Sequence, residues 1–193
     1  MTEPRLLSQW LWLRCLLAWI LLACAGSAQA QADSPAALER QVKAAYLYKF
    51  ASFVEWPETS FARPDSPLII GVSGSDALAE QLERIVAGRL VNGHPVKVRR
   101  VRRGDALADL HILFLADALE RSTIADMLLA ARGQPLLTVS DAPDPAALGC
   151  MIGFLIAEHK LRFDVALGNV AASGLRISAR MLAVAHKVQG AAS

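Results

Sequence analysis

The chain has 193 residues, 54% of them hydrophobic, and carries 20 lysines and arginines against 18 aspartates and glutamates. The formal net charge of +2 gives no electrostatic reason to expect nucleic acid as a partner. After the first thirty residues, no Ser/Gly-rich linker or internal repeat divides the sequence. We therefore expect one domain over residues 31–193, which is long enough to bury a sizeable core.

The first thirty residues have the pattern of a bacterial export signal. Arg5 and Arg14 precede an uncharged run over residues 15–25, and the small residues Ala28 and Ala30 are typical of a signal cleavage site. We predict a signal peptide that ends at Ala30 and a mature protein in the periplasm. Cleavage removes two arginines and one glutamate, which leaves a net charge of +1.

Two other fates of the leader stay open. The uncharged run, lengthened past Arg14, could remain as a membrane anchor. Leu-Leu-Ala-Cys at 21–24 resembles the lipobox of bacterial lipoproteins, which would make Cys24 the lipid-bearing residue. After cleavage at residue 30, Cys150 is the one cysteine left, so no internal disulfide can form. We expect Cys150 to be buried, with an intermolecular bridge as the alternative.

The mature chain begins with a predicted helix over residues 35–56. Ser-Pro at 34–35 supplies a capping hydroxyl and a proline at the first helical position, and a further proline after Trp56 stops the helix. The aromatic side chains of Tyr46, Phe50 and Phe53 recur at spacings of three and four, which places them on one apolar face. We expect this face to pack on a sheet rather than to bind a ligand.

Apolar runs and helical periodicities alternate along the rest of the chain. We expect strands at 67–72, 96–101, 111–115 and 136–139, helices at 77–86 and 117–131, a hairpin of strands 151–157 and 161–167, and a mostly helical segment at 170–188 with a break near Gly174. This order is typical of an α/β single-domain sandwich. Its central sheet would be largely parallel and flanked by helices, with a C-terminal β-hairpin.

One strand-to-helix turn is the best candidate for a small-molecule site. Ser73, Gly74 and Ser75 follow a predicted strand and open a helix, where free backbone amides can bind an anion. Ser140 ends another strand and could line the same crevice, the usual ligand position of a parallel α/β sheet. The alternative is structural, because Ser75 or Asp76 can simply cap the helix.

The sequence contains no recognisable catalytic arrangement. It lacks a Gly-x-Ser-x-Gly nucleophile elbow and a Gly-Lys-Ser/Thr phosphate loop, and its histidines show no ligand spacing. These histidines are His94, His111, His159 and His186. We expect no catalytic residue, metal or cofactor, and therefore a protein that is not an enzyme.

A dense basic run occupies Arg99, Arg100, Arg102 and Arg103. Positive charge on an exposed sheet edge discourages aggregation between strands, which is the structural interpretation. The alternative is a surface that steers an acidic partner. We expect replacement of all four arginines by serine to leave folding nearly intact.

The residues at 43–57, Lys-Ala-Ala-Tyr-Leu-Tyr-Lys-Phe-Ala-Ser-Phe-Val-Glu-Trp-Pro, resemble the opening helix of the YfiR family. The resemblance continues in order over nearly the whole mature chain. Similar segments are Leu-Ile-Ile-Gly-Val-Ser-Gly at 68–74, Ala-Asp-Leu-His-Ile-Leu-Phe-Leu at 108–115, Leu-Leu-Thr-Val-Ser-Asp at 136–141, Arg-Phe-Asp-Val at 162–165 and Ser-Ala-Arg-Met-Leu at 178–182. Relatives often carry a cysteine before the His-Ile-Leu-Phe segment, where this chain has Leu110.

The resemblance implies a periplasmic regulator that binds and inhibits the periplasmic domain of an inner-membrane diguanylate cyclase. Such a protein would lower cyclic di-GMP signalling and biofilm formation, and family members are described as homodimers. Any family behaviour that depends on a disulfide next to Leu110 does not carry over. The alternative function is a periplasmic small-ligand-binding sensor module for another membrane receptor, such as a histidine kinase.

Overall fold

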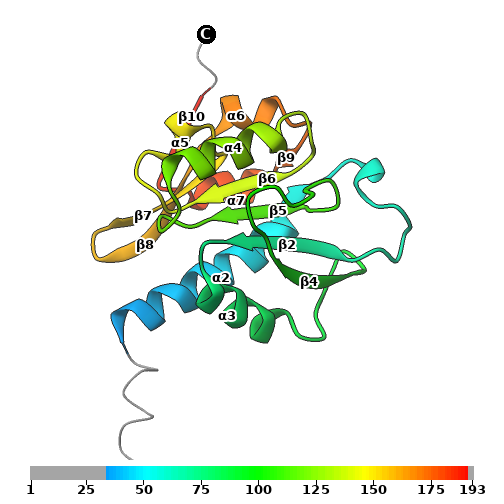
Figure 1. Ribbon diagram of the computed structural model, residues 1–193, viewed down its shortest axis with the longest axis horizontal. Coiled ribbons are helices and arrows are strands. Elements are labelled where there is room, and N and C mark those ends of the chain that lie inside the picture. Colours follow the sequence, from blue (N-terminus) through cyan, green and yellow to red (C-terminus); the bar gives the residue numbers. More distant parts are fainter. Residues whose placement is uncertain (1–33, 191–193) are drawn as a thin grey trace, which may run out of the picture. The chain divides into compact units, whose positions relative to one another are not determined.

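The computed structural model describes residues 34–190, and the chain from Arg40 onward forms one unit with a central sheet between helices (Figure 1). The predicted signal peptide, its cleavage site at Ala28 and Ala30, and Cys24 lie outside the described residues. Within the described part of the chain, no helix is both long and apolar enough to span a membrane.

Eight strands form the main sheet in the order β10-β8-β7-β6-β5-β2-β4-β3. Neighbouring strands are parallel except in the pairs β3–β4 and β7–β8. The strands are β2 (Leu68–Ser73), β3 (Leu90–Val91), β4 (His94–Arg100), β5 (Ile112–Leu115), β6 (Leu137–Ser140), β7 (Ile152–Ala157), β8 (Lys160–Ala166) and β10 (Lys187–Gln189). A separate antiparallel pair joins β1 (Val54–Glu55) to β9 (Arg176–Ile177). The predicted fold class is confirmed, including the β7–β8 hairpin.

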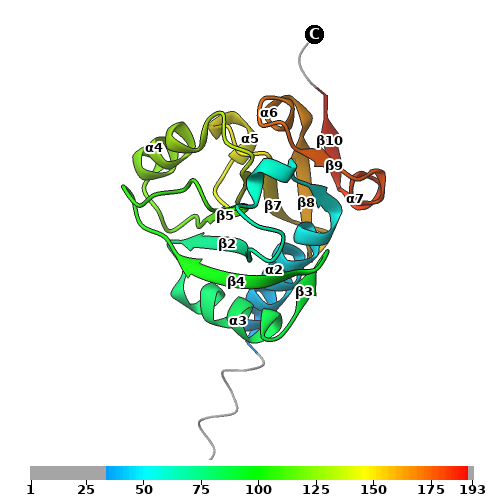
Figure 2. The ribbon, with the colours of Figure 1, turned by 90° about the vertical axis from the view of Figure 1, so that its right-hand side faces the viewer.

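Helices cover both faces of the sheet (Figures 1 and 2). They are α2 (Pro35–Phe53), α3 (Asp76–Val86), α4 (Arg121–Ala131), α5 (Pro145–Leu148), α6 (Leu167–Ala171) and α7 (Ala179–Val184), with a short 3₁₀ helix at Glu58–Ser60. Strand β5 shows how the two faces arise. Ile112 and Phe114 join the apolar cluster that contains α3, whereas Leu113 and Leu115 join the cluster that contains α4. Alternate side chains of a strand point to opposite faces, so a strand buried on both sides reads as one continuous apolar run.

The aromatic face of α2 packs on the β7–β8 hairpin, as expected. The ring of Phe50 lies 5.1 Å from that of Phe163 and 5.9 Å from that of Phe154, measured between centroids. Tyr46 adds an edge-to-face contact with Phe163 at 5.4 Å. Phe50 is buried and Tyr46 is half-buried, so both belong to the core.

Two predicted elements near the ends of the domain are wrong in part. The helix expected over 35–56 ends at Phe53, because Val54 and Glu55 pair with β9 instead. The segment expected to be mostly helical over 170–188 contains only the end of α6 and the short α7, separated by β9 and followed by β10. Strand β10 forms because Val188 pairs with Val165 of β8. Both strands depend on partners distant in sequence, which local helical periodicity cannot reveal.

Candidate functional site

A crevice lies where the strands β2, β5 and β6 end, the position predicted from the sequence. It encloses a cavity of about 180 Å³, and Gly74 and Ser75 belong to its lining. Other walls come from segments that follow β5 and β6 and from helix α2. The lining residues are Arg40, Lys43, Gly74, Ser75, Leu78, Phe114, Ala116, Asp117, Ala118 and Asp141.

Two of the four predicted crevice residues lie beneath it instead. Ser73 is 2% exposed and its hydroxyl contacts the sulfur of Met127 at 3.6 Å. Ser140 is fully buried, donates a hydrogen bond from Oγ to the carbonyl of Leu115 at 2.7 Å, and accepts one from the N–H of Ala142 at 3.1 Å. Both hydroxyls serve the packing of the sheet, and neither lines the crevice.

The other two predicted residues shape the turn. Ser75 is the N-cap of α3, where its Oγ accepts a hydrogen bond from the N–H of Leu78 at 3.3 Å. Gly74 adopts a positive φ of 82°, and an added Cβ would lie 2.7 Å from the Cγ of Leu119. Only glycine combines that backbone conformation with so little space. The structural interpretation of this turn therefore accounts for both residues.

Helix α2 contributes a charged pair that sequence reasoning missed. The ammonium of Lys43 forms an ion pair with Asp141, and the two side chains are 12% and 17% exposed. The second carboxylate oxygen of Asp141 accepts a hydrogen bond from the N–H of Asp117 at 2.7 Å. The two residues are 98 positions apart, so no local pattern connects them. Both oxygens of Asp141 are occupied by protein groups, which makes this carboxylate a structural link.

The basic run is largely neutralised by neighbouring acids. Arg99 binds both carboxylate oxygens of Asp109 at 2.8 Å, Arg100 pairs with Glu83 at 2.6 Å, and Arg103 pairs with Asp126. The bond to Glu83 raises the pKa of Arg100 above its ordinary value. Intramolecular pairing of this kind favours the structural interpretation over a free basic surface.

Two of the histidines form a ring stack around Phe61. The Phe61 ring lies 3.8 Å from that of His94 and 4.4 Å from that of His111, centroid to centroid. His111 is 3% exposed, and its Nδ1 accepts a hydrogen bond from the N–H of Ile69 at 3.2 Å. Its Nε2 has no hydrogen-bond partner among residues 34–190. Burial, together with the nearby charge of His94, lowers the pKa of His111 to about 4. Over residues 34–190 no cluster of three or more His, Cys, Asp or Glu could hold a metal.

Cys150 is buried at 1% exposure in the apolar cluster that contains α4. Burial raises the pKa of its thiol to about 12, so the thiolate that would form a disulfide is scarce. Leu110, the residue at the position where relatives often carry a cysteine, is also buried, and it packs closely over Gly71. These positions serve core packing in this chain.

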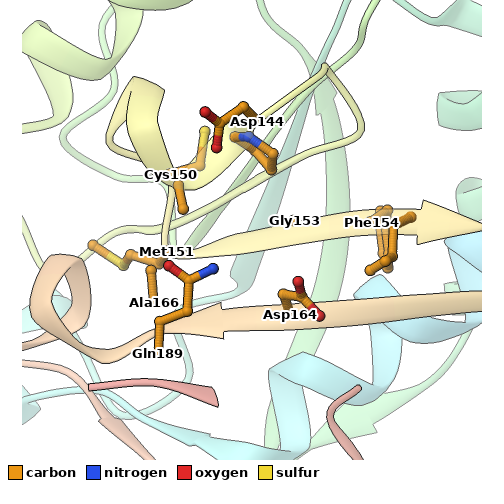
Figure 3. A pocket seen from close by; sticks show the side chains of 11 residues that line it. Asp144, Cys150, Met151, Gly153, Phe154, Asp164, Ala166 and Gln189 are labelled. Atoms are coloured by element: carbon orange, nitrogen blue, oxygen red, sulfur yellow. The ribbon is translucent and has the colours of Figure 1, made fainter. Parts of the chain in front are cut away.

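A second cavity, of about 230 Å³, was not predicted (Figure 3). It lies between α5 and the strands β7, β8 and β10. The lining residues are Asp144, Pro145, Ala146, Cys150, Met151, Gly153, Phe154, Leu155, Asp164, Ala166 and Gln189. Gly153 marks the contact between α5 and the sheet, since an added Cβ would lie 2.2 Å from the Cγ of Pro145. A glycine inside an apolar strand is the one sequence signal that could have indicated this close approach.

The chain was compared with known protein families. The model of a family described as YfiR/HmsC-like matches residues 40–186, which is more than half of the chain. The matched residues include every residue that lines the crevice. A search of curated proteins finds no match.

Proposed function

The chain belongs to the YfiR/HmsC-like family of periplasmic regulators of diguanylate cyclase signalling, and we propose that it binds the periplasmic domain of an inner-membrane diguanylate cyclase and holds the enzyme inactive. The observation that carries this proposal is the family match over residues 40–186, from helix α2 to the residue before β10. Release of the cyclase would raise cyclic di-GMP and favour biofilm formation. The protein would act through binding and not through chemistry of its own.

A signal can release such a complex only if it binds the free and the docked forms of the regulator with different affinity. Internal bonds already occupy the side chains of Lys43, Ser75 and Asp141 in the crevice. Acids also neutralise three of the four arginines in the basic run. Neither arrangement provides a nucleophile, a base and an orienting partner together. A role in binding is consistent with this chemistry.

The experiment that tests the proposal begins with deletion of the gene in its own organism and measurement of cyclic di-GMP. We expect the level to rise, and to return to normal when the full chain is supplied again. A level unchanged by deletion would contradict repression. A matched control supplies residues 31–193 without the leader, which should remain in the cytoplasm and fail to restore the level.

Capture of the partner is the second step. The tagged full chain is cross-linked in intact cells and purified from solubilised envelopes, and bound proteins are identified by mass spectrometry. Recovery of a membrane protein with a diguanylate cyclase domain is the expected result. Recovery of a histidine kinase in its place would favour the alternative function as a sensor module for that receptor.

Export, processing and assembly belong to the same proposal. We propose that residues 1–30 are removed after Ala30, that Cys24 is removed with them, and that the mature protein is a homodimer. Mass spectrometry of the purified N-terminus distinguishes a chain that starts at Gln31 from one that starts at an acylated Cys24. Light scattering after size-exclusion chromatography gives the molar mass, and a monomer over the whole concentration range would exclude the dimer.

A small ligand in the crevice remains a separate proposal. Gly74 and Ser75 line the cavity at the N-terminus of α3, and Arg40 adds a positive charge. An anionic effector such as a nucleotide would interact with these groups. Titration calorimetry with a panel of nucleotides tests it, and heat that disappears in an Arg40→Gln variant is the expected result. An absence of heat would leave the turn with its capping role alone.

A further inference from the structure

From the cavity between α5 and the sheet, we infer that this protein binds a small organic cation with an apolar body there, and that Asp144 and Asp164 hold its positive end (Figure 3). The register of the strands fixes which side chains share the cavity's face. Gly153 pairs with Asp164, and Gln189 pairs with Ala166. Strand neighbours in register point to the same side of a sheet, so all four lie on the face that α5 partly covers.

The floor of this cavity is apolar. Cys150, Met151 and Ala166 are all at least nine-tenths buried, and Pro145 closes one side where it contacts Gly153. An apolar floor with few polar groups at its rim is the usual composition of a small-molecule site. Burial of a ligand's hydrocarbon part against this floor supplies the favourable hydrophobic contribution.

The polar groups at the rim have unused hydrogen-bonding capacity. The carboxylate of Asp144 makes no capping bond to α5, and it has no other partner among the described residues. One oxygen of Asp164 accepts a hydrogen bond from Nδ1 of His186 at 2.9 Å, which leaves the other oxygen available. Gln189 is half-buried beside them. This differs from the crevice, where protein donors occupy both oxygens of Asp141.

The charge of the lining decides the chemical class of the ligand. Among residues 34–190, two carboxylates and no lysine or arginine line the cavity. Lys187 is the register neighbour of Asp164, yet within residues 34–190 it forms no ion pair with either carboxylate. A ligand ammonium would gain charge-assisted hydrogen bonds from both acids, whereas a ligand carboxylate would be repelled.

In the test, phenethylamine is titrated into the purified mature protein. Binding is monitored through the backbone amide signals in NMR spectra. We expect saturable shifts at Gly153, Ala166 and Gln189. Phenethyl alcohol and phenylacetate, which match the probe in shape but are neutral and anionic, should bind at least about tenfold more weakly. Equal binding of all three compounds would overturn the assignment of charge. Shifts confined to other parts of the protein, or no shifts at all, would overturn the site.

Two variants remove one charge each with little change in shape. Asp144 adopts a left-handed conformation with φ 51° and ψ 57°, which asparagine tolerates well, so Asp144→Asn should fold normally. In Asp164→Asn the side-chain oxygen can still accept the bond from His186. Each variant should weaken phenethylamine binding about tenfold or more. Asp117→Asn, which removes an acid from the crevice, is the matched control and should bind phenethylamine normally. An equal loss of phenethylamine affinity in all three variants would contradict the site.

Discussion

Lys43 of α2 and Asp141 after β6 form an ion pair that joins a helix to the end of a central strand, with both side chains largely shielded from water. Partial burial makes the loss of one partner more costly than at the surface, because the other charge stays desolvated. We expect Lys43→Met to lower the free energy of unfolding by roughly 1–3 kcal/mol, measured by urea denaturation.

A double-mutant cycle separates the pair from the other contacts of Lys43. Asp141→Asn keeps an oxygen that can accept the bond from the N–H of Asp117. It should therefore lower the free energy of unfolding by less than Lys43→Met does. The double variant should lose less free energy of unfolding than the two single variants together. The difference, which is the coupling energy of the pair, should be about 0.5–3 kcal/mol. Strict additivity would mean that the pair contributes nothing to stability.

Gly74 is required by both its backbone conformation and its surroundings. Gly74→Ala places a Cβ 2.7 Å from Leu119 and 3.0 Å from Ala116, at a φ of 82°. We expect this variant to lose roughly 2–4 kcal/mol in the free energy of unfolding, from backbone strain and overpacking together. Gly88→Ala is the control, since φ is also positive there but no atom of the described chain lies within 4 Å of the added Cβ. Its loss should be only about 1 kcal/mol, and equal losses would contradict the packing argument.

Local sequence patterns predicted the central strands well and the ends of the domain poorly. The run at 68–72 is apolar because both faces of β2 are covered, and this property is visible in the sequence itself. By contrast, β9 is two residues long and exists only because Ile177 pairs with Val54. No periodicity can be detected over two residues.

The candidate site was likewise predicted only in part. The positions of Ser73 and Ser140 at strand ends were predicted, but the direction of their side chains into the protein was not. Strand alternation alone does not say which face a terminal residue takes when both faces are covered. Asp164 and Gln189 share a cavity because β8 pairs in parallel with β10, an element that the sequence pattern did not reveal. Asp144 joins the same lining from the start of α5.

The arginine run should be almost dispensable for folding. The side chains of Arg99, Arg100 and Arg103 are each at least 36% exposed, so solvent screens their ion pairs and each pair contributes little to stability. We expect replacement of all four arginines by serine to keep one cooperative thermal transition, with Tm lower by about 2–8 °C. Arg102→Ser alone should not shift Tm, because within residues 34–190 its guanidinium has no partner. Loss of the cooperative transition would show that the run holds the fold together.

Cys150 should be inert in the native protein. Its thiol is buried and its pKa is raised to about 12, so the reactive thiolate is both scarce and inaccessible. We expect a thiol reagent to label the mature protein only as fast as the surrounding structure opens, and rapidly in denaturant. Rapid stoichiometric labelling under native conditions would contradict the burial. A disulfide-linked dimer on non-reducing gels would support the intermolecular bridge instead.

His111 should make stability depend on pH in the mildly acidic range. Burial lowers its pKa from 6.5 to about 4 in the folded state, with a further contribution from His94, while Asp109 and the backbone of Ser60 act in the opposite direction. Between these two values the unfolded chain binds a proton that the folded chain does not. The free energy of unfolding should therefore fall as pH falls from about 6.5 to about 4, by at most about 3 kcal/mol from this group.

Urea denaturation across this pH range measures the slope, and two variants identify its source. His111→Gln can still accept the bond from the N–H of Ile69 but cannot gain a charge, so its stability should change less with pH. His159→Asn removes an exposed imidazole from a turn with φ 58°, where asparagine fits, and should keep the slope of the wild type. A slope that persists unchanged in His111→Gln would assign the pH dependence to another group.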